Sequence, residues 1–331
     1  MSETLLEVKD LTIEIATRRG PATVVDGIDL HVGKGETLGI VGESGCGKSL
    51  TMLSLLKLLP NKIRVAGGSA MFGGRDLLTL NNKELRAIRG GRIGFVFQDP
   101  MTSLNPVMRI GDQLAEPLIH HRAMSKAAAR QRAGELLKLV GIPGAEQRLD
   151  AYPHELSGGM RQRVMIAIGL ACDPDLLIAD EPTTALDVTI QAQIVDLVKG
   201  LRQRLGMSVV WITHDLALIA GLADRICVLY AGTVVEDAPV DQLFAEPAHP
   251  YTRGLLASIP RMGAPDSARL SSIGGTPPEP GRRPAGCPFA PRCPLAEDVC
   301  RTTVPALAPL RGEATPHRVA CHVANRVMEA A

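Results

Sequence analysis

A glycine-rich segment of eight residues constrains the fold of this chain more than any other feature. Residues 42–49 read GESGCGKS, the G-x-x-x-x-G-K-S pattern, and directly follow the apolar run 37–41. The apolar pattern from Ser49 to Leu59 predicts a helix that Pro60 ends. Glycines allow such a loop to turn its backbone N–H groups toward an anion, and the N-terminus of the next helix adds positive potential. The order of strand, loop and helix therefore predicts a phosphate-binding loop rather than a chance glycine-rich turn.

Two side chains of this loop carry the predicted chemistry. Lys48 is expected to bridge the β- and γ-phosphates of a nucleoside triphosphate, and the Ser49 hydroxyl is expected to ligate Mg²⁺. The predicted nucleotide contacts comprise the loop and the residue after it, namely Gly42, Glu43, Ser44, Gly45, Cys46, Gly47, Lys48, Ser49 and Leu50.

A second acidic motif follows a predicted strand. The apolar run Leu176 to Ala179 ends in Asp180 and Glu181. Ligands bind at the carboxyl edge of a parallel sheet, so both carboxylates are predicted to face the nucleotide. Asp180 is expected to hold Mg²⁺ through water, and Glu181 to polarise the attacking water as general base. An acidic turn after a strand is common by itself. Together with the loop at 42–49 in the same domain, however, it strongly indicates a nucleotide-hydrolysing site.

Composition and charge exclude several other classes of protein. The 331 residues carry 36 Lys and Arg against 35 Asp and Glu, a formal net charge of +1, so no strong field favours nucleic acid as a partner. No apolar run approaches the roughly 18 to 20 residues that cross a bilayer. Residues 1–10 lack the order of a secretory signal, which predicts a cytosolic location.

Four further motifs stand in a fixed order along the chain. They are FVFQDP at 95–100, LSGGMRQ at 156–162, ALD at 185–187 and WITHD at 211–215. With the two motifs above, this order resembles the ATP-binding cassette (ABC) ATPases over residues 5 to about 245. The resemblance implies an α/β P-loop NTPase fold with a RecA-like core, an antiparallel β subdomain and a helical subdomain at about 99–155. It places a nucleotide-binding domain at 1–245 and a C-terminal extension at 246–331.

The resemblance also implies how ATP is bound. Two ATPase subunits pair head to tail, and each ATP lies between the loop of one subunit and the LSGGMRQ signature of the other. The implied signature-side contacts are Ser157, Gly158, Gly159 and Asp187. Gln98 would sense Mg²⁺ and the attacking water, and His214 would bond the γ-phosphate, so the implied catalytic residues are Glu181, His214, Gln98 and Lys48.

One departure from the family concerns the adenine. The family stacks this base on an aromatic residue, but no Phe, Tyr or Trp precedes Phe72 in this chain. We therefore expect aliphatic contacts from Ile15 or Val24 instead.

Local segments narrow the resemblance to one branch. QDPMTSLNP at 98–106, DEPTTALDVTIQAQ at 180–193 and HPYT at 249–252 look like the D-type ATPases of dipeptide and oligopeptide importers. This branch implies a second, related ATPase subunit, two permeases and a substrate-binding protein, with the chain at the cytoplasmic face of the inner membrane. Two alternatives stay open: an importer of nickel, glutathione or a glycoside, and a mainly regulatory ATP-binding subunit.

The C-terminal extension carries four of the seven cysteines. Cys287, Cys293, Cys300 and Cys321 form C-x5-C-x6-C-x20-C among prolines that enforce turns. Four thiolates suit either Zn²⁺ or an iron–sulfur cluster, and four free thiols are the plain alternative. His317 and His322 are less favoured substitute ligands. The resemblance implies a [4Fe–4S] cluster, with Zn²⁺ as the lesser possibility.

Overall fold

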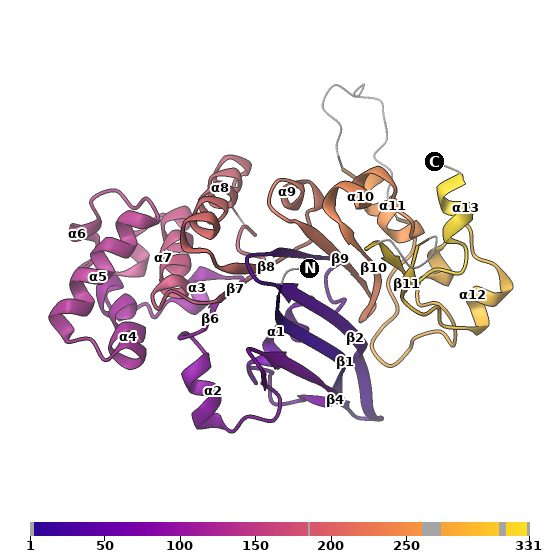
Figure 1. Ribbon diagram of the computed structural model, residues 1–331, viewed down its shortest axis with the longest axis horizontal. Coiled ribbons are helices and arrows are strands. Elements are labelled where there is room, and N and C mark those ends of the chain that lie inside the picture. The colour runs from indigo at the N-terminus through magenta and orange to yellow at the C-terminus, as the bar shows by residue number, and fades with distance from the viewer. Residues whose placement is uncertain (1–2, 185, 260–272, 311–315, 330–331) are drawn as a thin grey trace. The chain divides into compact units, whose positions relative to one another are not determined.

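The computed structural model describes residues 3–184, 186–259, 273–310 and 316–329, and it divides into two compact units (Figure 1). The first unit comprises Met1–Glu3, Gly33–Thr37 and Thr79–Ile212. The second comprises Thr4–Val32, Leu38–Leu78 and Thr213–Ala331. The C-terminal extension therefore belongs to the same unit as the loop at 42–49.

An antiparallel sheet forms one part of the second unit. Its strand order is β2-β1-β4-β5, with the bounds β1 (Thr4–Thr17), β2 (Gly20–Gly33), β4 (Ile63–Phe72) and β5 (Arg75–Asp76). In β1, Leu6 and Val8 are buried and pair with Phe72 and Ala70 of β4. This alternation buries one face of the strand, and the predicted antiparallel β subdomain is present.

A mixed sheet carries the loop at 42–49 in the same unit. Strand β3 (Thr37–Val41) pairs in parallel with β9 (Arg225–Tyr230), and every residue of both strands is buried. The neighbours beyond β9 are antiparallel: β10 (Thr233–Pro239), then β12 (Arg318–Val319), then β11 (Ala308–Pro309). The extension thus adds its two short strands to the sheet that supports the loop.

The helices of the second unit are short. They are α1 (Lys48–Leu55), α9 (Leu216–Ala220), α10 (Val240–Ala245), α11 (Pro250–Ala257), the 3-10 turn η2 (Ala290–Arg292), α12 (Asp298–Thr302) and α13 (Ala324–Glu329). The predicted extent of α1 to Leu59 is wrong. Lys57 takes a φ of 50° just after the C-cap, so the helix ends before Pro60 can act.

The first unit contains three parallel strands. β6 (Ile93–Val96) pairs with β7 (Leu176–Asp180), and β7 pairs with β8 (Ser208–Thr213). Strands β7 and β8 are buried along their whole length, as their continuous apolar sequences predict for strands covered on both faces.

Helices make up the rest of the first unit. They are α2 (Asn82–Ile88), α3 (Pro100–Ser103), α4 (Ile110–Arg122), α5 (Lys126–Leu139), α6 (Ala145–Arg148), the 3-10 turn η1 (Pro153–Glu155), α7 (Gly158–Leu170) and α8 (Val188–Leu205). Helices α3 to α6 lie within the range predicted for a helical subdomain. In the part of the chain that the structure describes, no helix combines the length and the apolar character that a membrane span requires.

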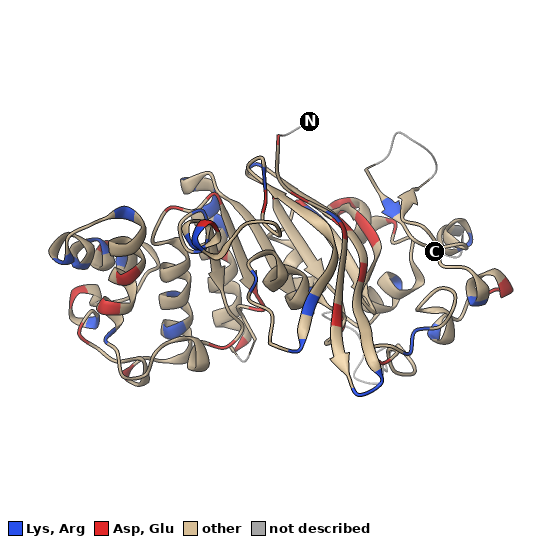
Figure 2. Ribbon diagram, turned by 90° about the horizontal axis from the view of Figure 1, so that it is seen from below, with Lys and Arg blue, Asp and Glu red and all other residues tan. Residues whose placement is uncertain are grey.

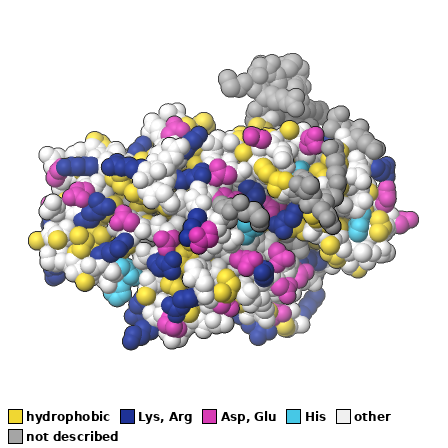
Figure 3. Space-filling model, viewed as in Figure 1, with side chains coloured by type: hydrophobic (Ala, Val, Ile, Leu, Met, Phe, Trp, Pro, Cys, Tyr) yellow, Lys and Arg dark blue, Asp and Glu magenta, His cyan; other side chains and the backbone are white. Residues whose placement is uncertain are grey.

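Lys and Arg residues and Asp and Glu residues are both scattered along the ribbon, as Figure 2 shows. On the face in Figure 3, hydrophobic side chains lie among charged ones. Among the exposed large apolar side chains, four fall close together in sequence in the first unit: Phe97, Met101, Val107 and Ile119.

A buried carboxylate joins the extension to the rest of the second unit. Glu236 of β10 is fully buried and accepts hydrogen bonds from the N–H groups of Ala248 and His249, at 2.7 and 3.0 Å. Its Oε1 also lies 2.7 Å from Nε2 of His317. His249 in turn caps α11, because its Nδ1 accepts from the N–H of Tyr251 at 3.0 Å. A buried carboxylate with this many donors stabilises the fold instead of penalising it.

The cap gives a stability prediction. Burial lowers the pKa of His249 from 6.5 to about 4. Below pH 6.5 the His249 imidazole takes up a proton in the unfolded chain but stays neutral in the folded chain. The free energy of unfolding therefore decreases as pH falls from 6.5 to about 4. His249→Asn keeps a capping acceptor and removes this titration. Urea unfolding across this range should show the wild type losing roughly 3 kcal/mol more than the variant.

The exposed His120 offers the matched control. His120→Asn should follow the wild-type pH dependence, and equal slopes for wild type and His249→Asn would contradict the prediction.

Candidate functional site

The loop at 42–49 is held by close backbone approaches in the second unit. A β-carbon built on Gly42 would lie 2.2 Å from the carbonyl oxygen of Leu229 in β9. One built on Gly47, which precedes α1 with a φ of 102°, would lie 2.9 Å from Cγ2 of Val25. Neither position accepts a side chain, which explains two of the glycines that define the motif.

Lys48 reaches back over this loop. Its side chain is buried, and Nζ donates hydrogen bonds to the carbonyls of Gly42 and Glu43 at 2.7 and 3.1 Å. The ammonium is therefore fixed above the loop, and Ser49 and Leu50 follow in the first turn of α1. This is the placement that a phosphate-binding lysine requires.

Two residues of the loop, Glu43 and Cys46, are bonded to other parts of the second unit. The N–H of Glu43 donates to the hydroxyl of Tyr251 at 2.8 Å, so it is engaged by a side chain and is not open to an anion. Burial raises the pKa of the Cys46 thiol, and its carbonyl accepts from the N–H of Gly232 at 2.9 Å. A buried thiol of raised pKa is unreactive, so Cys46 fills space.

Two carboxylates end β7 in the first unit. Asp180 is buried at the end of the strand. Glu181 adopts a φ of 44°, and its N–H donates to the carbonyl of Ile212 in β8 at 3.0 Å. A non-glycine residue in this region is uncommon and costs energy, and such strain concentrates at functional positions.

Two donors orient the Glu181 carboxylate. Nε2 of Gln98, just beyond β6, lies 3.1 Å from Oε2 of Glu181. The hydroxyl of Thr184 donates to the same oxygen at 3.0 Å. The structure thus brings together Gln98 and Glu181, which the sequence named separately. Thr184 was not predicted; its position three residues after Glu181, in the turn after a strand, is the signal that could have found it.

The LSGGMRQ signature begins α7 in the same unit. Ser157 caps this helix as predicted, its hydroxyl accepting from the N–H of Met160 at 3.3 Å. Ser157 and Gly158 are exposed. A β-carbon on Gly159 would lie 3.0 Å from Cγ2 of Ile190, so the signature lies beside the start of α8.

Asp187 and His214 occupy element boundaries. Oδ1 of Asp187 accepts from the N–H of Ile190 at 2.9 Å and caps α8. His214 is exposed and follows β8, at a bend where the N–H of Asp215 donates to the Thr213 hydroxyl at 3.0 Å. The predicted residues therefore fall into two sets. The loop and His214 belong to the second unit, whereas Gln98, Asp180, Glu181, the signature and Asp187 belong to the first.

The two aliphatic residues predicted to contact adenine differ in position. The carbonyl of Val24 would lie 3.5 Å from a β-carbon on Gly47, so Val24 borders the loop. Ile15 pairs with Ile63 within the antiparallel sheet.

The four cysteines of the extension belong to the second unit. The N–H of Cys287 donates to the carbonyl of Cys300 at 2.8 Å. Burial raises the pKa of the Cys287 and Cys293 thiols, and it raises that of Cys321 to about 12 with a further contribution from the other three sulfurs. Yet no group of three or more His, Cys, Asp or Glu side chains among the described residues could hold a metal ion.

The two histidines named as substitute ligands have other partners. His317 bonds Glu236 as described above, and Nε2 of His322 lies 3.0 Å from the carbonyl of Thr303. Neither contact includes a cysteine of the extension.

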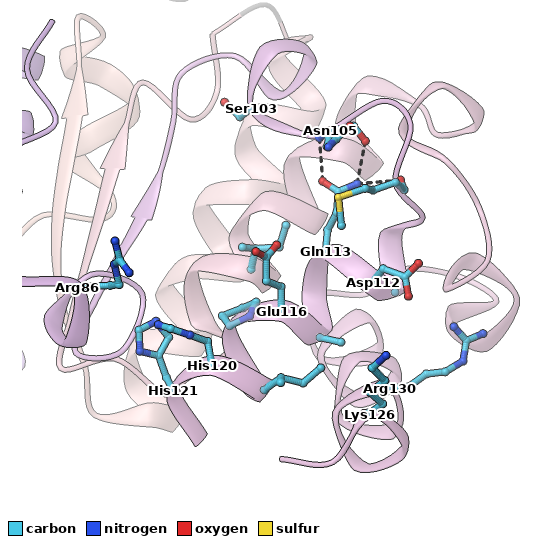
Figure 4. Close-up of a pocket in the computed structure, with 16 residues that line it drawn as sticks. Arg86, Ser103, Asn105, Asp112, Gln113, Glu116, His120, His121, Lys126 and Arg130 are labelled. Carbon is cyan, nitrogen blue, oxygen red and sulfur yellow. Dashed lines mark hydrogen bonds between the residues drawn. The ribbon is translucent and has the colours of Figure 1, made fainter. Parts of the chain in front are cut away.

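A pocket lies along α4 in the first unit (Figure 4). Gln113 fixes its upper rim, because Nε2 donates to the carbonyls of Asn105 and Met108 at 3.0 Å each and Oε1 accepts from the N–H of Asn105 at 2.9 Å. Glu116, His120 and other polar side chains line the rest.

Comparison with known proteins gives two family matches within the chain. The ABC transporter family model matches residues 25–184, and the model for the oligopeptide/dipeptide transporter C-terminal region matches residues 235–300. The chain is 52% identical over 305 residues to the oligopeptide transport ATP-binding protein AppD of Bacillus subtilis, covering 92% of this chain and 93% of that protein. It is 50% identical over 304 residues to the dipeptide transport ATP-binding protein DppD of the same organism, covering 92% and 90%.

Solved structures agree on the fold. The dimeric ATP-binding cassette MJ0796 bound to ADP and Pi matches with a TM-score of 0.64 and 32% identity, over 71% of this chain and 98% of that one. CbiO1 from Clostridium perfringens, part of the cbiONQ transporter complex, matches with a TM-score of 0.62 and 27% identity, over 74% and 92%.

The Thr184 contact predicts a kinetic effect. Thr184→Val removes a hydrogen bond to a carboxylate, worth roughly 1.5–3 kcal/mol. We expect kcat for ATP hydrolysis to fall about tenfold with KM for ATP nearly unchanged. Thr184→Ser keeps the hydroxyl and should retain activity, whereas a valine variant with wild-type kcat would contradict the role.

Proposed function

The chain belongs to the ATP-binding subunits of ABC transporters, and we propose that it hydrolyses ATP to drive the import of dipeptides or oligopeptides. The single observation that carries the substrate class is the pairing of an ABC transporter match with an oligopeptide/dipeptide transporter C-terminal match in one chain. Two relatives, which share 52% and 50% of aligned residues with this chain, are named for oligopeptide and dipeptide transport. The alignments cover nearly their whole length.

The proposed chemistry assigns a task to each motif. The loop N–H groups and Lys48 hold the triphosphate, and His214 bonds the γ-phosphate. Glu181, oriented by Gln98 and Thr184, polarises the attacking water. Mg²⁺ would be held by Ser49, Gln98 and Asp180 and would neutralise charge on the phosphates.

The proposed assembly is a head-to-tail pair of ATPase subunits. The exposed Ser157 and Gly158 at the N-terminus of α7 suit contact with a nucleotide held by a partner. Asp187 borders the same surface from the start of α8. We propose that the partner is a second, related ATPase, which makes the pair a heterodimer.

Permeases would dock on the first unit at the cytoplasmic face of the inner membrane, with a substrate-binding protein delivering the solute. The pocket along α4 has a polar rim fixed by Gln113, and the exposed apolar side chains of Met101 and Val107 lie close to it in sequence. Apolar groups exposed beside a polar rim are typical of a protein interface. Two permeases are proposed, each supplying a segment to one ATPase subunit.

Two other assignments share the same ATPase chemistry. Solute choice lies with the binding protein and permeases, so nickel, glutathione or a glycoside is the second candidate cargo. A mainly regulatory ATP-binding subunit is the third possibility, but the Glu181 carboxylate with its two donors favours a working site.

Glu181→Gln tests the enzymatic role. The amide keeps the side-chain shape but cannot act as a base, so turnover in the assembled transporter should fall at least about 10²-fold while ATP still binds. The matched control is Glu146→Gln, an exposed carboxylate of the same unit that pairs with Lys138. Unchanged turnover and peptide uptake in Glu181→Gln would instead assign hydrolysis to the partner's site and leave this subunit a regulatory role.

We further propose that the four cysteines of the extension hold a [4Fe–4S] cluster. The mutual influence of the sulfurs on the pKa of Cys321 supports a shared centre. Four thiolates suit either Zn²⁺ or an iron–sulfur cluster, and the prolines around Cys287 and Cys293 suit a chain that wraps around a small centre. The cluster is proposed over zinc because the resemblance to the D-type importer ATPases implies it.

Anaerobic purification tests this proposal. We expect about four iron and four sulfide per chain with visible absorption, both lost in Cys293→Ser and kept in Cys172→Ser, which alters a cysteine of the first unit. Stoichiometric zinc, or no metal, would overturn the cluster.

A further inference from the structure

One arginine of the extension contacts the phosphate-binding loop directly. Arg292 ends η2, next to Cys293, and its side chain is 4% exposed. Nη1 and Nη2 donate to the two carboxylate oxygens of Glu43 at 2.7 and 2.9 Å. This is the parallel, two-bond arrangement that gives arginine–carboxylate pairs their strength and fixed geometry.

The remaining donors of this guanidinium are also used. Nε donates to the carbonyl of Gly274 at 2.8 Å, Nη2 to that of Ile273 at 3.2 Å, and Nη1 to the hydroxyl of Tyr230 at 3.3 Å. The cation also lies 5.7 Å from the ring centre of Tyr230 and 5.8 Å from that of Phe289. All five N–H groups have acceptors, so the side chain has a single position.

Glu43 is held from its backbone as well. Its N–H donates to Tyr251, and its carbonyl accepts from Nζ of Lys48 at 3.1 Å and from the N–H of Cys46 at 3.3 Å. The Tyr251 ring packs 4.7 Å from that of Tyr230, which contacts Arg292. The same aromatic cluster therefore supports both ends of the contact between Arg292 and the loop.

The ion pair between Arg292 and Glu43 also neutralises a negative charge in the loop. A carboxylate in a loop that binds a triphosphate opposes the ligand by like-charge repulsion. The guanidinium beside it cancels that charge, and Glu43 in turn raises the pKa of Arg292, so the cation persists at any physiological pH.

We propose that Arg292 is a positioning residue for nucleotide binding, which sets the shape of the loop at 42–49 and neutralises Glu43. The proposal rests on the proposed nucleotide site. It also gives the cysteine-bearing extension a task in the ATPase cycle, because the segment that carries Cys293 also carries the residue that supports the loop.

A merely structural role makes a different prediction. If Arg292 only attached the extension to the rest of the second unit, then the loss of any other attachment of equal strength would weaken nucleotide binding to the same extent. Arg318 provides the comparison, because it joins β12 of the extension to Asp237 of β10 and not to a residue of the loop. Asp237 keeps Arg225 as a partner at 2.7 Å when Arg318 is removed.

The test is a set of four full-length variants: Arg292→Gln, Glu43→Gln, the double variant, and Arg318→Gln as matched control. The readouts are MgATP affinity by titration, the KM and kcat of hydrolysis, and thermal unfolding. Arg292→Gln leaves Glu43 unpaired, so Kd and KM should rise about tenfold while kcat changes less than about twofold. The double variant removes the unpaired charge and should recover most of the affinity. Arg318→Gln should leave Kd within about twofold of wild type.

Results of two kinds would overturn the proposal. One is a Kd for Arg292→Gln that matches wild type in a folded variant. The other is equal weakening by Arg292→Gln and Arg318→Gln, or a double variant no better than Arg292→Gln, since each would reduce the contact to an anchor. A wild-type chain that fails to bind MgATP would overturn the proposed function instead, so the two failures are distinguishable.

Discussion

A loop that binds phosphate must hold its backbone in one curved conformation, so that its N–H groups point toward the anion. Contacts from several parts of the second unit restrict the loop at 42–49 to one conformation. The carbonyl of Leu229 and the side chain of Val25 press against Gly42 and Gly47, which removes the room in which the loop could relax. Glu43 would add negative charge to an anion site, and Arg292 cancels it within a pocket of aromatic rings. The strands and the extension around the loop thus act as one support.

In the first unit, several contacts hold one carboxylate, that of Glu181, in a fixed orientation. Glu181 accepts hydrogen bonds from Gln98 and Thr184 on the same oxygen, and its strained backbone is tied to Ile212 of β8. Three strand ends therefore contribute to the position of a single side chain. Such pre-organisation lowers the cost of aligning a base with a water molecule.

The extension is part of the unit that carries the loop at 42–49 and not a separate appendage. Two of its strands join the sheet of β9 and β10, and His317 bonds the buried Glu236. Three of its four cysteines, Cys287, Cys293 and Cys300, lie within eight positions of Arg292, so these thiols and the residue that contacts the loop share one short segment.

The sequence by itself determined the elements whose signals are local. The strands at 37–41 and 208–213, the glycine-rich turn between β3 and α1 and the cap at Ser157 follow from patterns within a dozen residues, where periodicity and turn chemistry decide. The family followed from the order of motifs. The local pattern predicted the wrong end for α1. The helix was expected to run to Leu59 and to be ended by Pro60, but the backbone takes a positive φ at Lys57, before that proline.

Only the tertiary structure decided which distant residues meet. The contacts of Gln98 with Glu181 and of Arg292 with Glu43 join parts of the chain whose spacing carries no periodic signal, the pairs being 83 and 249 positions apart. The same holds for His317, which the sequence analysis named as a less favoured substitute ligand and which bonds Glu236 in the structure. Pairing across such distances depends on strand order and on the burial of charge, and these are properties of the folded chain that no segment contains alone.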